Sequence, residues 1–352
     1  MKPKKRTDLT IIKRQGTKLV PIGDIPERLK EAAKGFHSAS KSDNTKLAYT
    51  SDIRCFRGWC RDEGLDPFPA CTCETRRPDH DDDCQGGTSS GLVIAYMTWM
   101  ADERKLRVST IDRRLTTISQ ANKESGFRSP REDPRVRAVL KGIRRTLGVA
   151  KQKKAAILLE DLIKMTEKLP DNTRGRRDRT LLVLGFAMAG RRSEIVSLRV
   201  EDFKSSEPGI IVTLPRSKTD QEGMGYELGI PRDRSGETCR IIEAWLAALK
   251  DDGISSGPAF RRVYTDGSFG EAALRPREVA RRVKRALKMA GIPPASYSGH
   301  SLRAGFITQA SLNGKTLEQI MSQSRHQSVK IMLGYVRRAN IFKDSAAGGV
   351  AL

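Results

Sequence analysis

Apolar residues recur every three or four positions over long stretches of this chain, and this helical spacing constrains its fold more than any other feature. The first stretch begins at Ser42 or Asp43, either of which can cap a helix, and Gly64 ends it. Stretches with the same spacing lie at 91–104, 109–125 and 133–147. The sequence therefore predicts that residues 41–148 form an all-helical domain.

A short segment with three lysines, residues 149–156, separates this domain from a second one over 157–352. The second domain adds two apolar strands, 210–214 and 226–230, around a polar turn. Its expected helices lie at 159–169, 180–188, 238–250, 276–290, 301–312, 316–323 and 328–334, with a further candidate at 339–345. The predicted fold class is mainly α: an all-helical N-terminal domain, then an α-rich C-terminal domain with a small antiparallel β-sheet.

Lys and Arg outnumber Asp and Glu by 65 to 42, which gives a formal net charge of +23. Nucleic acid is the commonest partner of such a chain, and a basic surface that is merely solvated is the alternative. No apolar run reaches the roughly 18 residues that span a bilayer, and no signal-peptide core follows the basic start. We therefore expect a cytoplasmic protein that associates with the nucleoid through DNA.

Two segments lack helical spacing. Residues 1–40 are basic, and we expect a flexible arm that either touches a DNA backbone or is simply disordered. Residues 70–90 form a polar loop inserted into the first domain. This loop carries the donors of a possible tetrahedral zinc site, although a mobile acidic loop without metal is the alternative. These donors are Cys71, Cys73, His80 and Cys84.

The last fifty-odd residues carry the most specific pattern: His300 and Arg303 one helical turn apart, then His326, then Tyr335 nine residues later. A tyrosine that attacks a substrate needs cationic and proton-transferring neighbours, because its phenol, with a reference pKa of about 10, is protonated near pH 7. The same neighbours bind phosphate well. In a chain this basic, the pattern indicates chemistry on a phosphodiester of nucleic acid.

Two earlier motifs extend the pattern. Arg191 and Glu194 follow an apolar helix that ends in glycines, and Lys218 lies in the turn between the two expected strands. Each motif alone is typical of a solvated surface. The order Arg, Lys, His-x-x-Arg, His and Tyr in one basic chain is much harder to produce by accident.

In these motifs the chain resembles the tyrosine recombinases, or phage integrases, and within them the Cre-type enzymes. The order of elements is similar from about Thr45 to Tyr335. The resemblance makes Tyr335 the nucleophile and places His326 where the family has His or Trp. The residues that it implies are catalytic are Tyr335, Arg191, Arg303, His300, Lys218, His326 and Glu194.

The resemblance implies a role for each of these residues. Arg191 and Arg303 hold the non-bridging oxygens of the scissile phosphate and neutralise charge in the transition state. The two histidines hydrogen-bond the phosphate, and one of them assists deprotonation of the tyrosine. Lys218 protonates the departing 5′-oxygen, and Glu194 orients Arg191 or His300. The product is a 3′-phosphotyrosine, formed without ATP, metal or any other cofactor.

The resemblance also points to DNA contacts and to assembly. Ser109, Thr110 and Arg113 match positions where the Cre-type enzymes enter the major groove, and Arg113 can pair with a guanine, with a phosphate contact or a solvated face as alternatives. In the second domain, Arg277 and Arg282 lie on a basic helix. Residues 340–352 are expected to dock into a neighbouring protomer, so that monomers assemble as a tetramer on paired sites. Docking onto their own domain is the alternative.

A site-specific DNA recombinase is therefore the leading hypothesis. A topoisomerase or telomere-resolving relative would use the same chemistry, and a DNA-binding protein of this fold without recombination activity is the rival from another class. Plasmid resolution, phage integration and transposon movement are all open as settings.

Overall fold

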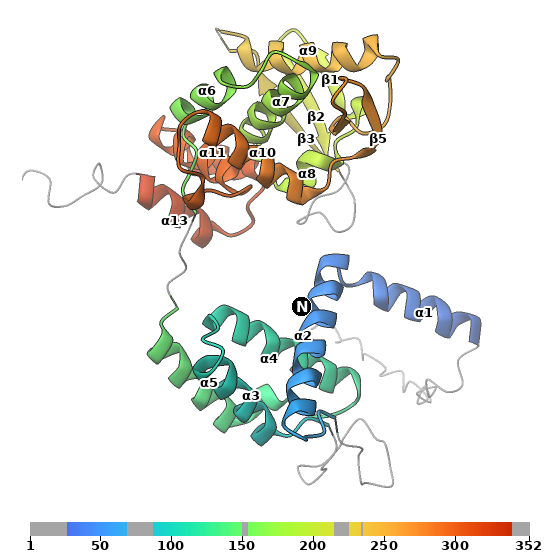
Figure 1. Ribbon diagram of the computed structural model, residues 1–352, viewed down its shortest axis with the longest axis vertical. Helices are drawn as coiled ribbons and strands as arrows, with labels where there is room; N and C mark the ends of the chain where they lie inside the picture. Colours follow the sequence, from blue (N-terminus) through green and yellow to red (C-terminus); the bar gives the residue numbers. More distant parts are fainter. Residues whose placement is uncertain (1–26, 69–86, 150–153, 215–224, 234, 340–352) are drawn as a thin grey trace, which may run out of the picture. The chain divides into compact units, whose positions relative to one another are not determined.

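The computed structural model describes residues 27–68, 87–149, 154–214, 225–233 and 235–339, as shown in Figure 1. The chain divides into two compact units, Met1–Lys151 and Gln152–Leu352. None of the described helices combines the length and the apolar content needed to cross a bilayer. Several predictions fall outside the described residues: the arm before residue 27, the zinc candidates Cys71, Cys73, His80 and Cys84, the hairpin lysine Lys218, and the segment 340–352.

The described part of the first unit is built of helices, as predicted. Its α-helices are α1 (Glu27–Ala39), α2 (Asp43–Asp62), α3 (Ser90–Asp102), α4 (Val108–Glu124) and α5 (Pro134–Leu147). Ser42 caps α2, because its hydroxyl accepts the Thr45 N–H. The helical spacing buries Phe56, Trp59 and Tyr96 together, and the first two rings each have their centroid 5.0 Å from that of Tyr96. These aromatic contacts join α2 to α3 at the centre of the core.

Helix α1 corrects the expectation of a flexible arm up to residue 40. The segment is rich in Glu, Lys and Ala, which have high helix propensity. Its large apolar side chains, Leu29 and Phe36, are 44% and 79% exposed. Because these side chains are exposed, the apolar spacing that located the other helices gave no signal for this one.

The two ends of the loop insertion are tied together. The Thr88 hydroxyl donates to the Pro67 carbonyl oxygen at 2.8 Å, and the Thr88 N–H donates to Asn122 Oδ1 at 2.8 Å. Gly87 has a φ of 79°, and a Cβ there would lie 2.6 Å from Asn122 Oδ1. A glycine is therefore needed where the chain re-enters the helical core.

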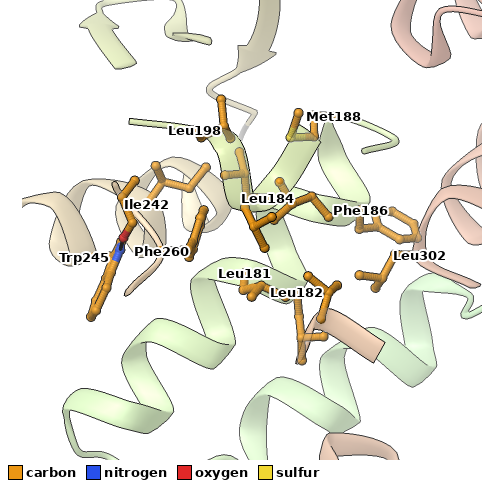
Figure 2. Packing of buried hydrophobic residues seen from close by; sticks show 14 of the residues in the cluster. Leu181, Leu182, Leu184, Phe186, Met188, Leu198, Ile242, Trp245, Phe260 and Leu302 are labelled. Carbon is orange, nitrogen blue, oxygen red and sulfur yellow. Dashed lines mark hydrogen bonds between the residues drawn. The ribbon is translucent and has the colours of Figure 1, made fainter. Parts of the chain in front are cut away.

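Helix α7 (Thr173–Ala187) lies at the centre of the second unit's core. Figure 2 shows Leu184 between Trp245 of α9 (Glu237–Asp251) on one side and Leu302 of α11 (Ser301–Leu312) on the other. The remaining α-helices are α6 (Leu159–Glu167), α8 (Arg192–Ser197), α10 (Pro276–Met289), α12 (Leu317–Ser324) and α13 (Val329–Ala339). The predicted start of α7 at residue 180 was late, because Asn172 caps the helix at the Gly175 N–H and the first turns are rich in arginine.

The predicted antiparallel sheet has three strands in the order β1-β2-β3. They are β1 (Phe203–Ser206), β2 (Gly209–Leu214) and β3 (Tyr226–Pro231). Val212 of the buried central strand pairs with Phe203 and with Leu228. Strand β1 and the separate hairpin of β4 (Arg261–Val263) and β5 (Phe269–Ala273) were not predicted, because each of these strands has only three to five residues.

Candidate active site

A tight turn between α7 and α8 directs Arg191. Ala189 has a φ of 47°, a left-handed conformation that is uncommon for a residue with a Cβ. At the following Gly190, a Cβ would lie 2.8 Å from Cγ1 of Ile195. Arg191 then precedes α8, and its backbone N–H donates to Glu194 Oε2 at 2.8 Å. The end of one helix and the start of the next therefore fix the backbone on which Arg191 stands.

Glu194 holds two arginine side chains. Its Oε1 accepts from Arg191 Nη1 at 2.5 Å, and its Oε2 accepts from Arg325 Nη2 at 2.8 Å. The residue is 2% exposed. Burial by itself would raise the pKa of Glu194, but Arg325 and the hydrogen bonds from Arg191 outweigh burial, so the pKa lies below its ordinary value. The carboxylate is therefore ionised near neutral pH and orients both guanidinium groups.

Arg303 of α11 lies beside His326, which follows α12. Arg303 Nη1 donates to the Ala189 carbonyl oxygen at 2.7 Å, and Nη2 lies 3.1 Å from His326 Nδ1. Burial, reinforced by the positive charges of Arg303 and Arg191, lowers the pKa of His326 to about 4. Burial and Arg191 likewise lower the pKa of Arg303, to about 10. Near pH 7 the histidine is therefore neutral and the arginine is charged.

Tyr335 is carried by α13, and its ring centroid lies 6.2 Å from that of His326. The helix is anchored by Met332, which is buried with Ile307 and Ile320 in a small apolar cluster that Tyr335 also contacts. The buried Ser324 hydroxyl lies 2.8 Å from His326 Nδ1. Packing thus places the phenol beside the histidine and arginine pair.

The structure therefore brings together five of the seven predicted catalytic residues: Arg191, Glu194, Arg303, His326 and Tyr335. The cluster also contains Arg325, so that among the described residues three guanidinium groups face one carboxylate, an excess of two positive charges. Such an excess at low exposure is costly without an anion. The site is suited to bind a phosphate group and to stabilise negative charge that develops on it.

His300 lies at the start of α11, one turn before Arg303, and is exposed. The buried Gly299 makes room for a neighbouring cation, because a Cβ there would lie 2.2 Å from Cδ of Arg192. Arg192 therefore packs against the backbone at Gly299, the residue before His300. The sequence analysis assigned Arg192 no role, although its place next to Arg191 was a signal.

Lys218 falls in the undescribed connection between β2 and β3. The described ends of that connection are informative, because Leu214 and Tyr226 face each other in the sheet. The Tyr226 hydroxyl lies 3.2 Å from the Ser322 carbonyl oxygen on α12. The hairpin thus ends against the helix that leads to Arg325 and His326.

Residues 156–340 match the model of the phage integrase family, which covers more than half of the chain. The chain belongs to the phage integrase family. An integrase/recombinase xerD homolog of Selenomonas ruminantium is 35% identical over 326 residues, which cover 91% of this chain and 89% of that relative.

Solved structures of this family share the fold. The XerH site-specific recombinase bound to a palindromic difH substrate has a TM-score of 0.56 at 15% identity, covering 75% of this chain and 73% of XerH. A lambda integrase dimer bound to a COC′ core site has a TM-score of 0.55 at 16% identity, covering 88% of this chain and 94% of that chain. The predicted fold class is therefore confirmed.

In this phage integrase family member, the predicted DNA-contact residues Ser109, Thr110 and Arg113 lie in the first half of α4. Arg113 is 47% exposed, and its Nη2 lies 2.9 Å from Oδ1 of the buried Asp52 on α2. Thr117 donates to the other oxygen of Asp52 at 3.1 Å. The buried Asp52 carboxylate therefore pairs with one edge of the Arg113 guanidinium, while the side chain remains half exposed.

A groove of about 530 Å³ lies between α2 and α4. Its basic side chains, Arg54, Arg57 and Arg61, follow one face of α2 at helical spacing. On α4, Thr117 lines the groove, and Thr110 and Arg113 lie on the same helix face by their spacing. The sequence analysis missed the three arginines of α2, although their spacing was visible.

Helix α10 carries the two remaining predicted DNA-contact residues, with different outcomes. Arg277 is exposed in the first turn. The side chain of Arg282 is only 22% exposed, and its Nε lies 3.5 Å from Oδ1 of the buried Asp178, which also pairs with Arg177. The Arg282 side chain thus lies toward a buried carboxylate and is less exposed than that of Arg277, and its contact with DNA stays a prediction.

Proposed function

We propose that this chain is a tyrosine-type site-specific DNA recombinase, which cleaves and rejoins DNA through a 3′-phosphotyrosine intermediate. The observation that carries the proposal is the cluster around Glu194. Among the described residues it combines three guanidinium groups around one carboxylate with a tyrosine whose ring lies 6.2 Å from a neutral histidine. A protein that only bound DNA would have no need of a tyrosine at that position.

In the proposed reaction the Tyr335 oxygen forms a bond to phosphorus and the bond from phosphorus to the 5′-oxygen breaks. Arg191 and Arg303 bind the non-bridging oxygens, because both retain guanidinium N–H groups beyond those already used. His300 and His326 hydrogen-bond the phosphate, and one of them takes the phenol proton. A second strand's 5′-hydroxyl reverses the step and reseals the DNA.

We assign the proton for the departing 5′-oxygen to Lys218. Support comes from the ends of its hairpin, because the Tyr226 hydroxyl at the start of β3 contacts Ser322, three residues before Arg325. Glu194 orients Arg191 through two hydrogen bonds and contacts no substrate in this scheme.

We also propose that the first unit binds DNA through the α2–α4 groove and the exposed edge of Arg113. The three arginines of the groove supply phosphate contacts, and a half-exposed guanidinium can reach a base edge. Arg277 supplies a further contact from α10. The solved relatives XerH and lambda integrase are themselves bound to DNA substrates.

Assembly as a tetramer on paired sites is proposed from a pocket of about 470 Å³ in the second unit. It is mostly apolar, and its lining residues include Leu159, Leu162, Val183, Phe186, Phe306 and Ile320. Residues 340–352 contain four large apolar residues, Ile341, Phe342, Val350 and Leu352, too few to form a core of their own. We propose that the pocket of one protomer receives this segment from a neighbour.

A nicked suicide substrate tests the proposal. Because the short 3′ fragment diffuses away after cleavage, a recombinase accumulates as a covalent protein–DNA adduct, whereas a binding protein forms none. A plasmid with two target sites then separates recombination, which gives deletion or inversion products, from topoisomerase activity, which only changes supercoiling. Target sites are first selected by binding from a random DNA library. Adduct formation without strand exchange on such plasmids would contradict the recombinase assignment.

A further inference from the structure

Arg325 has a backbone conformation that its side chain does not favour. Its φ of 55° and ψ of 43° are left-handed, a region that residues other than Gly and Asn rarely occupy. It is also 7% exposed, which is unusual for an arginine. Such a conformation persists only where surrounding contacts over-determine it.

The guanidinium of Arg325 makes those contacts. Nη1 donates to the carbonyl oxygens of Met188 at 3.1 Å and Gln323 at 3.0 Å, and Nη2 donates to Glu194 Oε2 at 2.8 Å. Burial lowers the pKa of Arg325, while the carboxylate of Glu194 opposes that effect. The left-handed turn after α12 thus sends a long side chain back to the segment that precedes Arg191.

Arg303 acts on the next residue of that same segment. It donates to the carbonyl oxygen of Ala189, and Arg325 donates to that of Met188. Ala189 has a left-handed φ of its own. Arg303 and Arg325 bind its carbonyl oxygen and that of the residue before it, respectively. Both side chains therefore hydrogen-bond to the turn that directs Arg191.

We propose that Arg325 is a positioning residue for catalysis: it holds Glu194 and the Met188–Arg191 turn, and through them the Arg191 guanidinium, in register with the scissile phosphate. This inference rests on the proposed function. In this proposal Arg325 does not bind the phosphate, because its side chain is only 4% exposed and three of its N–H groups donate to Met188, Gln323 and Glu194. Removing the Arg325 side chain therefore loosens Arg191 but removes no residue that contacts the phosphate.

Two substitutions separate the side chain from the backbone. Arg325→Gly suits the left-handed conformation and removes the guanidinium, and Arg325→Met keeps an unbranched apolar stem but removes the guanidinium and its charge. Arg325→Lys keeps the charge but loses the planar fork that reaches three acceptors. Arg240→Met is the control, because it removes an exposed arginine of α9 that pairs with the exposed Glu237 and Ser235.

The first measurement is hydrogen exchange of the Arg191 amide in the free protein, since that N–H donates to Glu194. We expect exchange to accelerate by roughly tenfold or more in Arg325→Gly and Arg325→Met, as a charge-assisted hydrogen bond to Glu194 is lost. Exchange in the centre of α7 and in β2 stays within about twofold of wild type if the effect is local. Unchanged exchange at Arg191, or equal acceleration throughout the unit, would overturn the proposal.

The second measurement is single-turnover cleavage of a suicide substrate at saturating DNA. We expect the rate to fall by about 10- to 100-fold in Arg325→Gly and Arg325→Met, with partial rescue in Arg325→Lys. The Kd for one site should stay within about threefold of the Arg240→Met value, and a wild-type cleavage rate would overturn the positioning role. If the wild-type protein forms no adduct on any selected site, the proposed function fails, while hydrogen exchange still decides whether Arg325 fixes the turn.

Discussion

Each unit of this protein contains a buried carboxylate that serves two arginines, and the two arrangements differ in exposure. Asp52 and Glu194 are both 2% exposed. The side chains held by Glu194, Arg191 and Arg325, are 16% and 4% exposed. Of those beside Asp52, Arg113 is 47% exposed and Arg114 is 16% exposed. One cluster is enclosed, and the other presents a cation at the surface.

The difference in exposure indicates a difference in function. In the enclosed cluster, charges interact at a low effective dielectric constant and their geometry is fixed, which suits stabilisation of a transition state. At Arg113, water and salt screen the charge, and the free edge of the guanidinium can adapt to a partner. We therefore expect the second unit to control the rate of strand cleavage and the first unit to control affinity and sequence preference.

The largest effect should come from Arg191→Ala and Arg303→Ala in the enclosed cluster. Each removes a positive charge that is proposed to face the phosphate, so single-turnover cleavage at saturating DNA should fall by at least about 100-fold. Gel-shift affinity for one site should change far less. A wild-type rate for either variant would show that this arginine does not act in the site. It would also contradict the expectation that the enclosed cluster controls the rate of cleavage.

Arg113→Ala should weaken DNA binding and leave the cleavage rate unchanged, the opposite of the result expected for Arg191→Ala and Arg303→Ala. Loss of a base contact costs about 1–3 kcal/mol and relaxes specificity at one position, while the rate at saturating DNA is kept. Binding is measured on a panel of single-base variants of the selected site. Arg145→Ala on α5 is the charge-matched control, since Arg145 is exposed. If both variants lose affinity equally at every base, Arg113 contacts only phosphate.

Asp52→Asn tests, through the stability of the first unit, whether the two clusters are independent. The amide keeps an oxygen for Thr117 but leaves Arg113 and Arg114 without their carboxylate. We expect the free energy of unfolding of the first unit to fall by about 1–3 kcal/mol. Chemical denaturation followed through the tryptophans of α2 and α3 measures the change. Equal destabilisation of the second unit would show that the two clusters are not independent.

The smallest effect concerns pH. The pKa of His326 in the folded protein, about 4, lies below the reference value of 6.5. Its contribution to stability should therefore be complete above about pH 6.5 and be lost as pH falls toward 4. An NMR titration of the ring should give a midpoint near 4 without DNA and a higher one with a bound phosphodiester. A midpoint of 6.5 in the free protein would contradict the enclosed cluster.

The same contrast between enclosed and exposed features explains what could be predicted from the sequence. Helices with a buried face, such as α2 and α4, could be predicted because burial imposes a period on the residues. Helix α1, with Leu29 and Phe36 exposed, left no such trace. The motifs around Arg191, Arg303 and Tyr335 could be found because their residue types and order are specific. The roles given to these residues remain predictions.

Features that depend on long-range contacts could not be predicted. Arg325 meets Glu194 across 131 residues, and nothing in the local sequence indicates its left-handed conformation. The basic helix α10 shows the same limit, because composition alone does not separate the exposed Arg277 from Arg282, which faces Asp178. Tertiary packing decides which cations turn inward.

The decisive step of the proposed reaction is the attack of Tyr335 on a phosphodiester within the enclosed cluster. Its most direct test is mass spectrometry of proteolytic peptides from the covalent adduct trapped on a suicide substrate. We predict a single modified peptide, carrying a nucleotide on Tyr335 through a phosphodiester, and no adduct from Tyr335→Phe, which should still bind the same site. A nucleotide attached to any other residue, or cleavage by Tyr335→Phe, would contradict the account.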